Sequence, residues 1–371
     1  MYTLAQNRLS LIAGLLIIAG LTAAPAPASA QAGKPKPSTK PTSVKPAAKP
    51  AGGPIVLGTT QLPGDFGKLG TTYTVGTSRP LNFTLKSAEY TVTPYSIGNN
   101  TWVPKADQKL LVLHYTVHNP VQRDQGYTWS DLRFTAVDAN DTNHDYIQCV
   151  AREGTNQPLS ISLKPAQKLD VWAAILVPAE GVTPKLIVEQ ERGAPVVRYD
   201  LRGKVKPLAE PIADPADPDG ATARKEVPAQ AGTFYPIGVF EARLDEVAYT
   251  DQSILRREPG AGKRFVTAIF TLRNTSQRDA AYYWGHFGVT LKDADGEKVP
   301  YTQAMLKASR DEATDGTLAP GEEARVRFFF PVPKDVDGKT IQLAEGKQVD
   351  ARVARVFAFD LSTAAKQTAQ Q

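Results

Sequence analysis

The chain has 371 residues, a formal net charge of +5 and a single cysteine, Cys149. This length suffices for two ordinary domains, each with its own apolar core. One cysteine excludes an internal disulfide and leaves an intermolecular bridge as the alternative, so the domains must be stabilised by packing rather than by cross-links.

The first residues follow the order typical of a secretory signal peptide. Arg8 precedes an apolar run at residues 9–24, and small residues at 28–30 follow. We predict a signal peptide at residues 1–30 and an exported mature chain that is periplasmic, envelope-associated or extracellular. The run is shorter than the ~20 residues of a spanning helix, which favours cleavage over a retained anchor and predicts no transmembrane segment in the mature chain.

Residues 31–54 are rich in Pro, Ala and Lys, with five lysines and no acidic residue. This composition predicts a disordered tether. Together with Arg8, its lysines carry six positive charges, which leaves a net charge of −1 from Ile55 onward. The folded part therefore lacks the basic balance typical of nucleic-acid binding, and we predict no nucleic-acid partner. The tether is either a solvated spacer or a basic contact for anionic envelope polymer.

The motif Gln-Arg-Asp-x-x-Tyr-x-Trp occurs twice, at residues 122–129 and 277–284. A constant offset of 155 residues relates many further positions without a gap. It pairs Asn119 with Asn274, Arg123 with Arg278, Asp124 with Asp279, Tyr127 with Tyr282, Trp129 with Trp284 and Pro165 with Pro320. An offset this long predicts two whole domains in tandem rather than a solenoid of short repeats.

Composition places the boundaries of these two domains. We predict a first domain at residues 55–203 and a second at 233–363. The segment 204–232 is rich in Pro, Asp and Ala and is predicted to be a linker. Residues 364–371 are predicted to form a flexible polar tail.

The apolar pattern in both copies has a period of two. In residues 109–119, Leu111, Leu113, Tyr115 and Val117 alternate with the opposite face, and residues 264–274 repeat the pattern. This alternation is typical of strands. Further strands are predicted at residues 81–92, 131–137, 146–151, 170–178, 185–190 and 196–201. We therefore predict an all-β chain with two tandem immunoglobulin-like β-sandwich domains.

Three stretches of the second copy, at residues 270–284, 287–301 and 318–335, carry a family resemblance. They contain a strand ending in Asn, an Asp-x-Asp-Gly turn before a Tyr, and a Leu-x-Pro-Gly-Glu turn. This pattern resembles exported bacterial immunoglobulin-like domains of unknown function, related to the secreted immunoprotective-antigen sandwich. The first copy departs from it, with Ala166 in place of Gly321. The resemblance implies a sandwich fold and export, and it supplies no catalytic residue.

The repeated motif supplies the candidate interaction residues, which are Arg123, Asp124, Tyr127, Trp129, Arg278, Asp279, Tyr282 and Trp284. In one interpretation they form exposed ionic and aromatic patches that bind sugar rings or a peptide, with bivalency from the second copy. In the other, favoured interpretation, the Arg and Asp side chains hold the loop with charge-assisted hydrogen bonds and the Trp closes the sandwich edge.

Neither a metal nor another cofactor is predicted. His114 and His118 share a strand face but lie roughly 13 Å apart, too far to ligate one ion. Residues 138–145 resemble a calcium loop, yet Asn143 and Cys149 occupy the positions that require Gly and Glu. A hairpin rich in turn-forming residues explains the same stretch.

The sequence favours a protein without catalytic residues. It contains no Gly-x-Ser-x-Gly, no phosphate-binding glycine loop and no His-Glu-x-x-His. Our leading hypothesis is a non-enzymatic, exported interaction module for an envelope or extracellular protein. Polysaccharide binding by exposed Trp and Tyr is the alternative, and a hydrolase with a carboxylate pair is the distant one.

Overall fold

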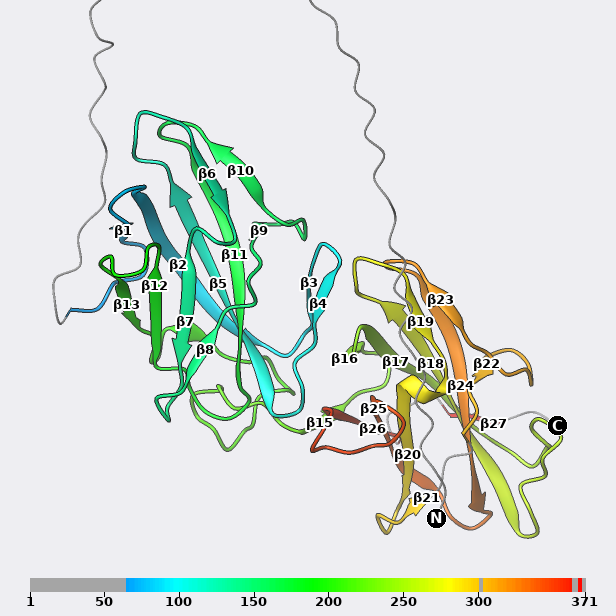
Figure 1. Ribbon diagram of the computed structural model, residues 1–371. Helices are drawn as coiled ribbons and strands as arrows, with labels where there is room; N and C mark the ends of the chain where they lie inside the picture. The colour runs from blue at the N-terminus through cyan, green and yellow to red at the C-terminus, as the bar shows by residue number, and fades with distance from the viewer. Residues whose placement is uncertain (1–64, 300–302, 362–365, 369–371) are drawn as a thin grey trace, which may run out of the picture. The chain divides into compact units, whose positions relative to one another are not determined.

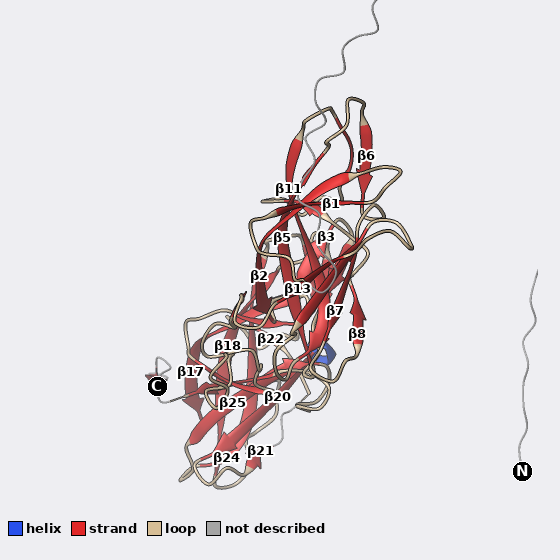
Figure 2. Ribbon diagram, turned by 90° about the vertical axis from the view of Figure 1, so that its left-hand side faces the viewer, coloured by secondary structure: helices blue, strands red, loops and turns tan. Residues whose placement is uncertain are grey.

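The computed structural model describes residues 65–299, 303–361 and 366–368. The predicted signal peptide and tether lie outside the described residues. Within them the secondary structure is almost entirely strand, and the one helical element is a single 3₁₀ turn, η1 (Trp284–His286), coloured blue in Figure 2. The prediction of an all-β, sandwich-type fold is confirmed.

The first sandwich consists of two main sheets and two small strand pairs (Figure 1). One sheet has the order β1 (Thr72–Val75), β2 (Leu81–Thr91), β5 (Gln108–His118), β11 (Lys168–Pro178), β9 (Ala151–Arg152), with β14 (Val205–Lys206) beside β2. The other has the order β13 (Val197–Asp200), β12 (Lys185–Glu189), β7 (Arg133–Val137), β8 (Asn143–Asp145). The small pairs are β6 (Gln125–Thr128) with β10 (Ser160–Leu163), and β3 (Tyr95–Ile97) with β4 (Asn100–Trp102).

The second sandwich has a corresponding set of strands. One sheet has the order β16 (Tyr235–Ile237), β17 (Phe240–Thr250), β18 (Lys263–Asn274), β24 (Glu323–Pro333), β22 (Leu306–Lys307), with β27 (Lys366–Thr368) beside β17. The other has the order β15 (Glu226–Ala229), β26 (Val356–Asp360), β25 (Gly338–Glu345), β20 (Phe287–Asp293), β21 (Lys298–Val299). The small pair is β19 (Ala280–Tyr282) with β23 (Gly316–Leu318).

Each sandwich encloses its own apolar core, as the alternating pattern predicts. In β5, the face that carries Leu111, Leu113 and Tyr115 points into the first core and is fully buried. The opposite face of β5 is also covered, because Val112 packs with Trp172 in a smaller cluster. In the second sandwich the core includes phenylalanines on β17, β18, β20, β24 and β26.

The two sandwiches pair their strands in matching registers at positions 155 residues apart. Gln125 lies opposite Leu163 in the first sandwich, and Ala280 lies opposite Leu318 in the second. The central pairs β2–β5 and β17–β18 also share a bulge, between Leu85 and Ser87 and between Leu244 and Glu246. Equivalent positions can therefore be compared residue by residue.

The segment predicted to be a linker is largely packed against the sandwiches. Leu208, Ala213 and Ala223 are buried in the first core, and β14 extends its sheet. Farther along, β15 pairs with β26 in the second sandwich. The small alanines allow this chain to lie closely on the first core, which composition alone does not reveal. The predicted flexible tail likewise includes a paired strand, β27, while residues 362–365 and 369–371 lie outside the described residues.

The strand predicted at residues 146–151 is not formed. Tyr146 makes only an isolated bridge to Ile175, and regular pairing begins again at β9. Gln148 has a φ of +50°, a left-handed conformation that interrupts an extended strand. The apolar residues of this stretch still contribute to packing, since Val150 is buried in the first core.

Ala166 is expected to be a point of backbone strain. It has a φ of +61° and donates its amide to the carbonyl of Asn119, whereas the equivalent Gly321 has a φ of +77° and donates to Asn274. The left-handed conformation costs a residue with a Cβ about 1–2 kcal/mol, and glycine costs about 0.5–1 kcal/mol in chain entropy. Ala166→Gly should therefore stabilise the first sandwich by about 0.5–1 kcal/mol in urea unfolding.

The matched control is Gly321→Ala in the second sandwich. Apart from the glycine and its two chain neighbours, no atom of the described residues lies within 4 Å of a Cβ built there, so the substitution tests the backbone conformation. It should destabilise the protein by a similar amount. If both variants and the native chain had the same free energy of unfolding, backbone strain at Ala166 would be contradicted.

Candidate functional site

The turn that carries each Gln-Arg-Asp motif is held by an asparagine. Asn119 donates its Nδ2 to the carbonyls of Arg123 (2.8 Å) and Leu163 (2.9 Å). Asn274 makes the same two bonds 155 residues later, to Arg278 and Leu318, both at 2.8 Å. The motif therefore supplies a main-chain carbonyl to a buried amide, and its charged side chains remain available for other contacts.

The four charged candidates lie at the surface. Arg123, Asp124, Arg278 and Asp279 are all exposed. In the part of the chain that the structure describes, none of their side chains makes a hydrogen bond or an ion pair. The interpretation in which Arg and Asp hold the loop through their own side chains thus differs from the observed bonds, in which the asparagine amide does so.

The aromatic candidates do not share one environment. Tyr127 is fully buried and its hydroxyl contacts that of Tyr115 at 3.0 Å, so it takes no part in a surface patch. Trp129 is 45% exposed. Tyr282 and Trp284 are half-buried against the second core, and Lys347 Nζ lies 6.0 Å from the Trp284 ring.

The histidines and the acidic turn have protein partners. His118 Nδ1 lies 2.9 Å from the amide of Asn82, and His114 lies between two glutamates. Asp138 accepts a hydrogen bond from His144 Nε2 at 2.9 Å and further bonds from the amides of the turn, and these bonds lower the pKa of its carboxyl group. Residues 138–142 therefore form the turn of the predicted hairpin, and residues 143–145 form its second strand, β8.

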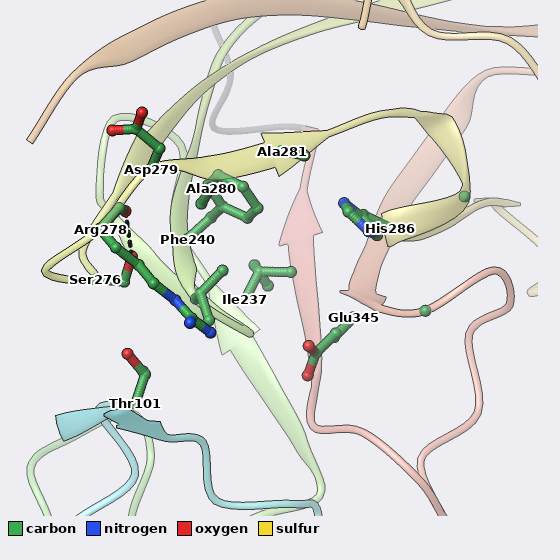
Figure 3. A pocket seen from close by; sticks show the side chains of 13 residues that line it. Thr101, Ile237, Phe240, Ser276, Arg278, Asp279, Ala280, Ala281, His286 and Glu345 are labelled. Atoms are coloured by element: carbon green, nitrogen blue, oxygen red, sulfur yellow. Dashed lines mark hydrogen bonds between the residues drawn. The ribbon is translucent and has the colours of Figure 1, made fainter. Parts of the chain in front are cut away.

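A pocket of about 510 Å³ lies beside the motif of the second sandwich (Figure 3). Within the second sandwich its walls come from the β16–β17 turn, the Gln-Arg-Asp turn with β19, η1 and the end of β25. The residues of the second sandwich that line it are Ile237, Val239, Phe240, Ser276, Arg278, Asp279, Ala280, Ala281, Gly285, His286, Glu345 and Gly346. This size is within the range of typical ligand sites, which combine apolar walls with a few polar groups.

Figure 3 shows Arg278 and Glu345 approaching the pocket from opposite sides, with Ile237 between them. Burial raises the pKa of the Glu345 carboxyl group, and the charge of nearby His286 opposes that rise. Gly238 brings the main chain close to this carboxyl group, because a Cβ there would lie 2.5 Å from Glu345 Oε1.

Three polar groups of the pocket lack a partner within the described residues. Nδ1 of His286 is buried without a hydrogen bond, and its ring packs at a tilt against that of Tyr283, with centroids 4.0 Å apart. The Glu345 carboxyl group and the Arg278 guanidinium likewise make no hydrogen bond or ion pair. A buried polar atom without a partner is costly, so Nδ1 of His286 favours a ligand that satisfies it. The exposed side chains of Arg278 and Glu345 offer charged groups to such a ligand at the same place.

The hydroxyl group that the second sandwich supplies to the pocket has partners within the protein. Ser276 Oγ donates to Asn274 Oδ1 and to the carbonyl of Arg278, both at 2.8 Å. Across residues 65–299, 303–361 and 366–368, no three His, Cys, Asp or Glu side chains are grouped to hold a metal ion. Among these residues there is also no helix long and apolar enough to cross a membrane.

Sequence reasoning found Arg278 and Asp279 but missed Glu345 and His286. Both are brought to the motif by the register of β25 with β20, in which Glu345 lies opposite Phe287. The sequence does contain a difference at these positions that could have directed attention to them. At the offset of 155, Glu345 replaces Gln190 and His286 replaces Asp131.

Comparison with known proteins finds a domain family of unknown function for part of the chain. A family model described as "Domain of unknown function (DUF4352)" matches residues 240–352, which lie in the second sandwich. The resemblance to a domain family of unknown function is thereby confirmed for this part of the chain. No curated protein matches the sequence.

Part of the chain is also similar to solved structures. An uncharacterized β-sandwich protein from Clostridium difficile 630 is 14% identical, with coverage of 37% of this chain and 95% of that chain and a TM-score of 0.27. The yjhA protein from Bacillus subtilis is 14% identical, with coverage of 35% and 97% and a TM-score of 0.22.

Proposed function

We propose that the mature chain is an exported, non-enzymatic interaction protein, made of two copies of one immunoglobulin-like domain related to the immunoprotective-antigen sandwich. The second sandwich would bind a protein of the envelope or the extracellular space through its pocket. The observation that carries this proposal is a set of groups around a cavity of about 510 Å³ that have no partner among the described residues, Arg278, His286 Nδ1 and Glu345. Arg123 and Asp124 would offer a second, shallower contact on the first sandwich.

Polysaccharide binding is the second candidate, and Trp129 favours it. This side chain is 45% exposed, and an exposed indole ring is a surface on which a sugar can stack. Trp172, by contrast, is only 4% exposed, so the four tryptophans do not form a common strip.

Co-sedimentation with cell-wall and outer-envelope fractions, before and after protease treatment of the fractions, tests the proposal. We expect the chain from Gln31 onward to bind in a protease-sensitive manner at high salt, and Arg278→Ala to reduce the bound fraction at least threefold. Trp129→Ala should have little effect. Protease-resistant binding that is lost in Trp129→Ala would favour the polysaccharide, and binding that vanishes in salt for every variant would assign it to the lysines of residues 31–54.

A further inference from the structure

The two sandwiches differ in the connection between their first two strands. In the first, residues 76–80 connect β1 to β2, whereas in the second only Gly238 and Val239 connect β16 to β17. Both connections begin with a left-handed glycine, at a φ of +79° for Gly76 and +61° for Gly238. The first sandwich therefore carries three additional residues at an otherwise equivalent place.

The additional residues are held by the surrounding surface through a basic side chain. Arg79 Nη2 donates to the carbonyl of Gly126 at 3.0 Å and lies 3.0 Å from the Asp131 carboxylate. The carbonyl of Arg79 in turn accepts a hydrogen bond from Gln190 Nε2. Both the guanidinium group and the main chain of Arg79 are thus held by polar contacts.

The residues on either side of Arg79 are recognised as well. Gln125 Nε2 donates to the carbonyl of Pro80 at 3.0 Å. The Glu191 carboxylate accepts bonds from the amide (3.3 Å) and hydroxyl (3.0 Å) of Thr77 and from the amide of Ser78 (3.2 Å). Each residue of the sequence Thr-Ser-Arg-Pro is therefore hydrogen-bonded to the rest of the first sandwich.

The residues that hold this loop correspond to lining residues of the pocket in the second sandwich. At the common offset of 155, Gln125 corresponds to Ala280, Gly126 to Ala281, Asp131 to His286, Gln190 to Glu345 and Glu191 to Gly346. The strand register supports this correspondence on both sides, since Arg133 pairs with Glu189 as Gly288 pairs with Ala344. The shorter β16–β17 turn leaves open the space that the β1–β2 loop fills.

We propose that this pocket binds an extended segment of a separate partner polypeptide in which a basic residue directly precedes a proline. The inference rests on the proposed function and specifies its ligand. The segment would lie where Thr77 to Pro80 lie in the first sandwich, with its cationic side chain at the carbonyl of Ala281 and the carboxyl group of Glu345. Ile237 and Phe240 supply an apolar wall for the proline ring.

Charge selects the basic residue. Glu345 presents a carboxyl group to the pocket, and in the described structure no cation is paired with it. Glu345 stands at the position of Gln190, and His286 stands at the position of Asp131. The carboxylate that would pair with the cation therefore comes from the end of β25, whereas in the first sandwich Arg79 pairs with Asp131. Exposed Arg278, on the opposite side, is placed to donate to main-chain carbonyls of the segment.

Titration of the complete mature chain with a defined peptide tests the inference. The probe is acetylated and amidated Gly-Thr-Ser-Arg-Pro-Leu, the sequence of residues 76–81, and its partner probe carries uncharged citrulline in place of arginine. We expect a Kd on the order of 0.1–1 mM for the arginine peptide, with NMR shift changes confined to the pocket residues, and at least fivefold weaker binding of the citrulline peptide.

Two pocket variants give opposite expectations. Glu345→Gln should weaken binding of the arginine peptide at least fivefold. His286→Asp introduces the carboxylate that Asp131 supplies in the first sandwich. It should tighten binding of the arginine peptide at least threefold and leave the affinity for the citrulline peptide unchanged. Because misfolding cannot produce a gain in affinity, the second variant keeps the test decisive. Glu180→Gln, which removes the same charge from an exposed site on the first sandwich, should leave both affinities unchanged.

Equal binding of both peptides, absence of binding by either, or weaker binding by His286→Asp would overturn the inference. So would pocket shifts produced by N-acetylglucosamine oligomers but not by the peptides. If the peptides fail while Arg278-dependent, protease-sensitive binding to envelope fractions persists, the proposed function stands and only its ligand is wrong. Loss of both results would overturn the proposed function as well.

Discussion

Asn274→Ala is expected to destabilise the second sandwich by about 3–5 kcal/mol. The side chain is 1% exposed and makes four hydrogen bonds, two from Nδ2 to the carbonyls of Arg278 and Leu318 and two at Oδ1 from the amide and hydroxyl of Ser276. Each buried partner left without a bond costs about 1–3 kcal/mol. Urea unfolding followed by tryptophan fluorescence measures the loss, with the transitions of the two cores fitted separately.

Two further variants identify the cause of that loss. Asn274→Asp keeps the volume and the acceptor but places a carboxylate oxygen against two carbonyl oxygens, so it should be at least as destabilising as alanine. Gln277→Ala changes an exposed residue of the same turn and should alter the free energy of unfolding by less than about 0.5 kcal/mol. A native-like stability of Asn274→Asp would show that the Nδ2 bonds contribute nothing.

Lys109→Met is expected to destabilise the first sandwich by about 2 kcal/mol at pH 7. Lys109 is fully buried, and its Nζ donates to the carbonyls of Ala179, Gly181 and Ala221 and lies 4.4 Å from the centroid of the Tyr90 ring. Methionine fills a similar volume but leaves these carbonyls without a donor. The ammonium group also joins the end of β11 to the packed segment around Ala221, so unfolding should lose cooperativity in the variant.

The difference between the native chain and Lys109→Met should grow with pH. Burial lowers the pKa of Lys109 to about 8, from 10.5 for the free side chain. Between these values the unfolded state binds more protons than the folded state, so stability rises with pH through this window and is constant below it. The expected rise is at most about 1.4 kcal/mol per pH unit.

Urea unfolding of both chains at pH 7, 8, 9 and 10 measures this difference directly. Buried tyrosines such as Tyr127 titrate in both chains and therefore cancel in the comparison. A gap that stays constant from pH 7 to pH 10 would mean that Lys109 titrates normally.

The sequence predicted the fold well because strand alternation and turn residues are local signals. The alternation in residues 109–119 marked the strand whose face enters the core, and Asp138 marked a turn that its own carboxylate closes. Composition did not indicate packing between segments that are distant in the sequence. The Pro- and Ala-rich segment 204–232 has the composition of a linker, yet it packs on the first core and accepts a hydrogen bond from Lys109, a residue about a hundred positions earlier.

The candidate site could be only partly predicted for the same reason. The repeated motif directed attention to Arg278 and Asp279, but repetition does not distinguish a buried Tyr127 from an exposed Trp129. The asparagine that holds the motif was visible only as one matched position among many. Its role follows from the approach of a strand that begins more than forty residues later.

By itself the sequence determined an all-β chain, the spacing of 155 residues and the absence of common catalytic motifs, because these depend on residue order alone. Only the tertiary structure decided where a ligand can bind. The pocket needs the short β16–β17 turn, the turn at Arg278 and the end of β25 at Glu345, and sheet register brings these three segments together. In the first sandwich three additional residues fill the same place, so the difference between a filled and an open surface depends on loop length and not on the motif.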